Sequence, residues 1–241
     1  MPTKEALAVC AEMEEAAMTP IQRAHALHWA GAVRSLAGDE HAHEEIARAR
    51  AVYADLGMKV IHGGSSITQG TVDLVRGAPA AAEAVLREGD AELEQAGEGG
   101  FRSTVLALLA FALCDQGRFD EARTVTEASA AITTPDDVVN VCFVAALRSR
   151  LAAVDGAIDE VERAARQALE ALERSDNFAF AIALILIAEA KRQIGEVAEA
   201  RSIASRALAL YERKQVPAGV ERVKAFLDEL ARAGGAVSES V

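Results

Sequence analysis

Aromatic residues are scarce in this chain. They make up 4% of its 241 residues, as 7 Phe, 2 Tyr and 1 Trp. The core of a β-sandwich or β-barrel needs more aromatic and β-branched residues than this, so the composition argues against both. Hydrophobic residues still make up 51% of the sequence, and alanine alone about a fifth of it. A core rich in alanine and leucine predicts closely packed helices, so we expect an all-α fold.

Signals for export or membrane insertion are also missing. The opening residues, MPTKEALAVC, have neither the basic nor the apolar stretch of a signal peptide. The longest apolar run, residues 178–188, is too short to span a bilayer. Cys10, Cys114 and Cys142 are odd in number and lie in apolar helical patterns, as reduced and buried thiols do. We therefore expect a cytoplasmic protein that contacts no membrane.

Clustered positive charge is a third absence. The chain has 25 Lys+Arg against 37 Asp+Glu, a net charge of −12, and no run of basic residues. Because clustered cations are what attract a phosphate backbone, no nucleic-acid partner is expected. The charged fraction of 26% is that of a folded chain rather than a disordered one.

Glycines recur at a regular interval, and this is the strongest signal in the sequence. Gly38, Gly77, Gly117, Gly156 and Gly195 are separated by 39, 40, 39 and 39 residues. Glycine ends helices because it tolerates the left-handed conformation, and proline starts them because its missing N–H is not needed there. Each period therefore predicts two helices joined by a tight turn at the glycine.

The repeat predicts one domain over residues 1–233 that contains five helical hairpins. A hairpin cannot bury its apolar face alone, so successive hairpins stack into a right-handed superhelical α-solenoid. A lone helix (about 4–17) precedes them, a capping helix (218–232) follows, and residues 234–241 are expected to form a disordered tail. The hairpins are expected over residues 20–56, 60–96, 101–132, 136–174 and 177–213.

The segment 106–132 resembles the tetratricopeptide repeat. In that family a small residue precedes the inter-helix glycine by seven positions, and an alanine follows it by five. Three units match, through Ala110, Gly117 and Ala122, through Ala188, Gly195 and Ala200, and through Gly70, Gly77 and Ala82. The first unit has His43 in the alanine position, and the fourth has Ser149 and Val161 around its glycine. A period above the usual ~34 residues implies longer helices.

A broader resemblance covers most of the chain. The run that extends from residues 101–137 to residues 207–230 is similar to the C-terminal tetratricopeptide region of bacterial signalling ATPases of the AAA or STAND type. Those proteins carry a nucleotide-cyclase or transcription-activator domain ahead of the ATPase domain. The resemblance implies a regulatory arm whose catalytic domains lie upstream, or a stand-alone relative of such an arm.

Motifs that bind phosphates or dinucleotides do not occur in the sequence. It contains neither Gly-x-x-x-x-Gly-Lys-Ser/Thr nor Gly-x-Gly-x-x-Gly. His25 and His28, three residues apart on one helix, could supply two metal ligands, but no cysteine or acidic pair has the spacing to complete a site. We predict no metal and no cofactor, and interpret both histidines as packed or solvated.

Residues 62–70, HGGSSITQG, are unusual for a first helix because they are rich in glycine and small polar residues. A catalytic Ser65 or Ser66 would need oxyanion donors and a histidine–acid pair, and the strand–turn–helix setting of a serine elbow is missing. We interpret the stretch as a late helix start or a flexible joint, with Gly70 in the small-residue position of the repeat. No enzyme active site is predicted.

The first helix of each tetratricopeptide pair lines a concave groove. Transferred to this chain, the resemblance implies a groove that is apolar in its middle and charged towards its C-terminal end. Its expected lining is His25, His28, Ile67, Thr71, Thr104, Phe111, Phe143, Arg150, Ile185, Glu189 and Arg192. A core role for Phe111, Phe143 and Ile185 stays open, as does a solvated, ion-paired face for Arg150, Glu189 and Arg192.

The sequence thus favours a non-catalytic interaction domain. Its groove would bind a peptide, a helix or a neighbouring domain, including upstream domains of the same polypeptide. One alternative is a small-molecule sensor or enzyme with a pocket near residues 62–70. Another is a homodimer joined through the groove.

Overall fold

The computed structural model describes residues 1–39, 41–173 and 177–238. Over these residues the chain forms α-helices and no strand, which confirms the expected all-α fold. None of the helices in this described part combines the length and apolarity needed to cross a membrane. The helices are α1 (Thr3–Ala16), α2 (Pro20–Leu36), α3 (Ala42–Asp55), α4 (Lys59–Val75), α5 (Pro79–Ala96), α6 (Gly100–Asp115), α7 (Phe119–Ile132), α8 (Val138–Val154), α9 (Ile158–Leu172), α10 (Phe180–Gln193), α11 (Val197–Lys214) and α12 (Pro217–Ser238).

The regularly spaced glycines lie in the turns between helices. All five have positive φ, from 71° at Gly156 to 101° at Gly38. At the end of α6, the Gly117 N–H donates to the Cys114 carbonyl (3.0 Å), and the next N–H donates to the Leu113 carbonyl (2.9 Å). A side chain is strained at such a φ, so glycine fixes where the helix ends. The predicted role of these glycines is confirmed.

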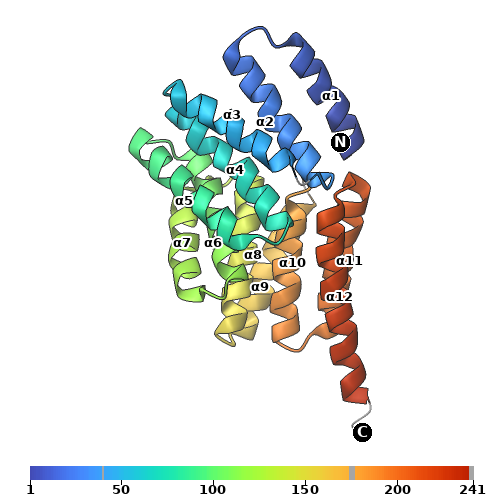
Figure 1. Ribbon diagram of the computed structural model, residues 1–241. Helices are drawn as coiled ribbons and strands as arrows, with labels where there is room; N and C mark the ends of the chain where they lie inside the picture. The colour runs from blue at the N-terminus through green and yellow to red at the C-terminus, as the bar shows by residue number, and fades with distance from the viewer. Residues whose placement is uncertain (40, 174–176, 239–241) are drawn as a thin grey trace.

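Helices pack against their neighbours in the chain, and several also pack against the helix two places further on. Consecutive helices contact each other, and α4 contacts α6, α6 contacts α8, and α8 contacts α10 (Figure 1). The middle helices are therefore enclosed by neighbours on several sides. Unbroken buried runs result over residues 105–114 in α6, 142–147 in α8 and 180–188 in α10. The longest apolar run of the sequence, residues 178–188, thus lies in the core except for half-buried Phe178.

The N-terminus lies against the corner between the last two helices. The Thr3 hydroxyl at the start of α1 lies 2.7 Å from the Lys214 carbonyl and 2.9 Å from the Gln215 carbonyl, at the corner between α11 and α12 (Figure 1). From that corner α12 extends across other helices, where Arg222 donates to the Asp115 carboxylate (2.7 Å) and to the Leu74 carbonyl. These acceptors lie near the ends of α6 and α4, so α12 holds together helices that are distant in sequence.

The last helix is longer than the sequence predicts. The capping helix was expected over 218–232, with a disordered tail after it, whereas α12 continues to Ser238. Residues 239–241 of the expected tail lie outside the described residues.

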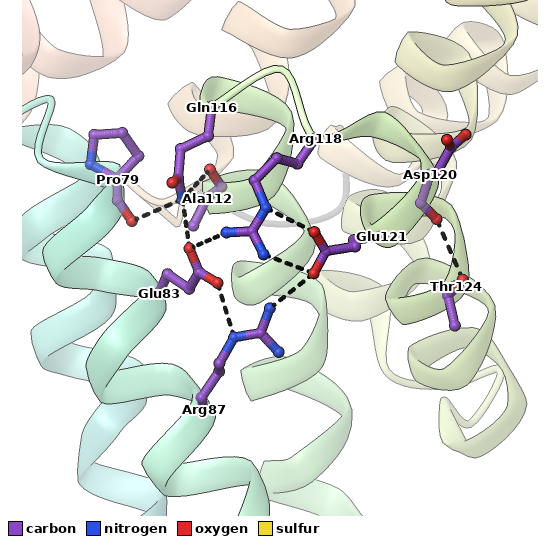
Figure 2. Close-up of polar contacts among 9 residues, drawn as sticks. All are labelled: Pro79, Glu83, Arg87, Ala112, Gln116, Arg118, Asp120, Glu121 and Thr124. Atoms are coloured by element: carbon purple, nitrogen blue, oxygen red, sulfur yellow. Dashed lines mark hydrogen bonds and ion pairs between the residues drawn. The ribbon is translucent and has the colours of Figure 1, made fainter.

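A polar network ties α5 to the α6–α7 turn (Figure 2). The Glu83 carboxylate accepts hydrogen bonds from Arg87 Nε (2.8 Å), Gln116 Nε2 (2.9 Å) and Arg118 Nη1 (2.6 Å). Arg118 also donates two hydrogen bonds to Glu121 at the start of α7, at 2.7 and 2.6 Å. Because Gln116 and Arg118 flank the turn glycine, the network fixes this turn against the preceding helical pair.

Candidate functional site

A pocket of about 340 Å³ opens between α2, α3, α4 and the start of α6. We call it the aromatic pocket, after the three rings in its wall. Its aromatic lining is Trp29, Tyr53 and Phe101, and its aliphatic lining is Val60, Ile61 and Ile67. The remaining lining is His25, His28, Gly64, Ser65 and Thr68. The structure therefore brings together His25, His28 and Ile67 of the predicted groove, beside the 62–70 stretch.

The rim of the aromatic pocket faces solvent and its floor does not. Trp29 is 49% exposed and Phe101 is 50% exposed, whereas Tyr53 and His28 are buried. The Glu98 carboxylate accepts a hydrogen bond from the Phe101 N–H (2.8 Å) at the start of α6. The Phe101 ring lies over Gly64, where an added Cβ would be 3.2 Å from its Cδ2. The absence of a side chain at Gly64 thus makes room for the ring at the rim.

His28 is a buried imidazole without a hydrogen bond to any described residue. Its Nδ1 is sealed from solvent and has no partner in the described structure. Burial, followed by the positive charge of Arg50 and the neighbouring His25, lowers the pKa of His28 to about 4. The ring is therefore neutral at pH 7. It packs edge-on to Trp29, with centroids 5.4 Å apart, and near Tyr53, at 6.2 Å.

His25 has a partner. Its Nδ1 lies 3.1 Å from the Tyr53 hydroxyl, and the two ring centroids are 5.2 Å apart. Burial raises the pKa of Tyr53 to about 12, so the hydroxyl stays protonated and can donate to His25. The two histidines that the sequence marked as a possible ligand pair therefore differ, because one ring is satisfied within the fold and the other is not.

The 62–70 stretch is neither a late helix start nor a joint. It lies inside α4, which begins at Lys59, and our sequence-based interpretation is wrong here. The reason is close packing against α5. A Cβ added at Gly70 would lie 2.7 Å from Leu86 Cγ, and one added at Gly89 of α5 would lie 2.1 Å from Ser66 Oγ. Small residues on both helices let the two backbones approach, which offsets the low helix propensity of glycine.

The two serines of this stretch are engaged by the helix and by Arg50. Ser65 lies within hydrogen-bonding distance of the His62 carbonyl (2.6 Å) and accepts from Arg50 Nη1 (2.8 Å). Ser66 donates to the Gly63 carbonyl (2.6 Å). His62 lies 2.6 Å from a carboxylate oxygen of Glu92 instead. Among the described residues, neither serine hydroxyl is hydrogen-bonded to a histidine ring, so no activated serine is assembled.

Other predicted groove residues lie in the core. Phe111 and Phe143 are each 1% exposed and pack edge to face, with centroids 5.2 Å apart. Ile185 and Thr71 are buried as well. Thr104 is half-buried and accepts a hydrogen bond from Asn140 (2.9 Å). The middle of the predicted groove is therefore filled by packed side chains.

The predicted charged cluster pairs within the chain. Arg150 Nε lies 3.4 Å from a Glu189 oxygen, and burial together with nearby Asp115 raises the pKa of Glu189. Arg192 turns to α12, where it pairs with Glu229 (3.0 Å) and lies 4.9 Å from the centroid of the Phe226 ring. The C-terminal end of the predicted groove is thus covered by the chain's own last helix.

A second charged cluster was not anticipated. Lys191, whose side chain is 1% exposed, donates to Glu196 and Glu199 (2.8 Å each) and to Glu162. The carboxylate oxygens of these three glutamates lie within 4.8 Å of one another, as in a metal site. The ammonium group occupies the position between them, so the cluster is explained as an ion-pair network that joins α9, α10 and α11.

Sequence reasoning missed the rings of the aromatic pocket. Trp29 and Phe101 do not fall on the repeat positions assigned to the groove, and Tyr53 belongs to a second helix. One usable signal was that the only tryptophan follows His28 directly.

No protein-family model matches the chain, and no curated protein is similar enough to count as a relative. Function therefore rests on the chain's own residues.

Proposed function

We propose that this chain is a non-catalytic interaction module, a tetratricopeptide-like α-solenoid of five helical hairpins that binds a segment of another protein. The glycine period of 39–40 residues, with positive φ at each turn, supports the repeat. Within this proposal the chain acts as a regulatory arm of a bacterial signalling protein, or as a free-standing relative. We place it in the cytoplasm, since its three cysteines are buried and free.

The observation that carries the proposal is the exposed rim of the aromatic pocket. Two aromatic rings about half exposed, beside Val60 at 37%, form an apolar surface around a cavity. Large apolar side chains gathered at a cavity mark interaction sites, because leaving them in water is unfavourable. The partner therefore docks on the helices of the N-terminal half, α2 to α4, and the start of α6.

The C-terminal end of the groove is a poorer docking site. Arg192 is engaged by Phe226 and Glu229 of α12, and Arg222 of the same helix holds Asp115. A partner at that end would have to displace α12 and break these ion pairs. The aromatic pocket needs no such displacement.

A test uses Trp29, the single tryptophan of the chain, as a reporter of pocket occupancy. Tryptophan-free peptides selected from a random phage-displayed library are titrated while Trp29 emission is recorded. Phe101→Ala should weaken binding about tenfold, because truncating an aromatic anchor removes a dominant contact. Ile158→Ala is the matched control, since Ile158 is 54% exposed on α9, far along the chain from the pocket. Equal affinity of both variants would place docking elsewhere, and light scattering separates a homodimer from a bound peptide.

A second candidate is a small-molecule sensor, because four residues of the unusual stretch line a cavity, namely Gly64, Ser65, Ile67 and Thr68. A volume of about 340 Å³ lies at the low end of ligand pockets, which span ~300–1,000 Å³. In the same assay a small molecule that shifts Trp29 emission, without any peptide doing so, would favour this candidate.

A further inference from the structure

We infer that the aromatic pocket receives one indole or phenol side chain, from a tryptophan or tyrosine in a basic segment of the partner, and that its ring N–H or O–H donates to His28. This inference rests on the proposed function and names the chemistry of the anchor residue.

The size and lining of the pocket favour a single aromatic side chain. The cavity of about 340 Å³ is too small for a large cofactor, and rings from α2, α3 and α6 surround it. Aromatic rings attract one another through offset or edge-to-face contacts, and Trp29 and His28 already adopt such an edge contact. A ring entering between Trp29 and Phe101 would continue this arrangement.

His28 supplies the polar selectivity. Its imidazole is neutral, and neither ring nitrogen has a hydrogen bond to any described residue. Nδ1 is sealed from solvent, so Nε2 is the nitrogen that an entering ring can reach, and no partner fixes which nitrogen carries the proton. A buried polar group is stabilised by gaining a hydrogen bond. An indole N–H can only donate, and a phenol O–H can donate, so either would set the tautomer in which His28 accepts. Phenylalanine and leucine would leave the imidazole unsatisfied.

Two features indicate a protein segment as the source of the ring, rather than a free small molecule. Trp29 and Phe101 are each about half exposed, and a protein segment can cover the rings at the rim as well as fill the cavity. The first 100 residues also contain 16 acidic and 8 basic side chains. This excess of negative charge attracts lysine and arginine beside the anchor.

The test compares short fluorescein-labelled peptides that differ at one residue, by fluorescence anisotropy with the full chain. All have lysine and arginine flanks, and the central residue is tryptophan, phenylalanine, or benzothienylalanine, in which sulfur replaces the indole N–H. The tryptophan peptide should bind about tenfold tighter than the benzothienylalanine peptide, since the latter leaves His28 unpaired. In His28→Leu the two should bind equally.

Each outcome is decisive. Equal binding of the tryptophan and benzothienylalanine peptides to the wild-type chain overturns the hydrogen bond to His28 but leaves the proposed function intact. This comparison uses the wild-type chain alone, so it is valid even if His28→Leu fails to fold. Free indole binding as tightly as the tryptophan peptide overturns the protein segment as the source. A peptide with glutamate flanks that binds as well as the basic one refutes the charge preference. If none of these peptides binds while the library-selected peptides do, the aromatic anchor is overturned and the proposed function stands. If neither set binds, the proposed function itself fails.

Discussion

Glu83 offers a direct test of how the helical pairs are held together. Its carboxylate, 14% exposed, accepts hydrogen bonds from Arg87, Gln116 and Arg118 (Figure 2). Burial raises the pKa of Glu83, but hydrogen bonds from Gln116, Arg87 and Arg118 outweigh it and lower the pKa from 4.5 to about 2. We choose Glu83→Gln, which keeps the shape of the side chain and removes its charge.

The size of the effect follows from the pKa. A downward shift of this size corresponds to at most about 3 kcal/mol of folding free energy. Both arginines are more than a third exposed, so solvent screening reduces this to about 1–2 kcal/mol. For a chain of this length, the variant should melt about 5 °C below the wild type at pH 7. Thermal denaturation followed by circular dichroism measures the difference.

The pH dependence distinguishes lost charge from lost packing. The folded pKa of Glu83 is depressed, so its stabilisation is complete above 4.5 and is lost as the pH falls towards 2. The difference in Tm between wild type and variant should therefore shrink at about pH 3. A difference that is equal at both pH values, or absent at pH 7, would refute the reasoning. The control is Glu160→Gln, whose exposed pair with Arg163 should leave Tm unchanged.

Three further predictions concern glycines and a buried lysine. Gly64→Ala should weaken tryptophan-peptide binding roughly tenfold, because the new Cβ would lie 3.2 Å from the Phe101 ring at the pocket rim. Its thermal stability should be nearly unchanged, and fluorescence anisotropy together with thermal denaturation checks both results. Gly89→Ala should lower the free energy of unfolding in urea by about 1–3 kcal/mol, since its Cβ would lie 2.8 Å from the Gly63 carbonyl oxygen. Combining it with Ser66→Gly in a double variant should restore part of this loss. Lys191→Met should lower the free energy of unfolding in urea at pH 7 by about 1–3 kcal/mol, because three half-exposed glutamates lose their common cation. An unchanged urea midpoint would show that the network does not stabilise the fold.

Helix ends were predictable because their causes are local. The first hairpin, expected over residues 20–56, begins with α2 at Pro20 and ends with α3 at Asp55. Thr19 caps α2: its hydroxyl accepts from the Gln22 N–H, and its own N–H donates to Gln22 Oε1 (2.9 Å). Gly38 ends the turn that follows the helix. A cap and a glycine act over a few residues, so the sequence contains all that determines them.

The 62–70 stretch was predicted wrongly because its helical conformation depends on packing against another helix. Glycine propensity predicts a broken helix, and tertiary packing reverses that prediction through close contact with Leu86 and Gly89 of α5. The rim of the aromatic pocket was not predicted, for the same reason. Phe101 begins α6 and reaches the pocket only because Gly64, on another helix, leaves room for its ring.

The residues expected to line a groove fall into two sets: some lie together at the aromatic pocket, and the charged ones pair with each other or with α12. Repeat position alone brought His25, His28 and Ile67 to one cavity, since these depend on neighbouring hairpins. At the other end, Arg192 pairs with Glu229 across 37 residues of sequence, and Arg222 reaches Asp115 across 107. Nothing in a local pattern specifies such long-range contacts. The same helix covers Arg192 and leaves the aromatic pocket open, and this pocket is where we propose that a partner binds.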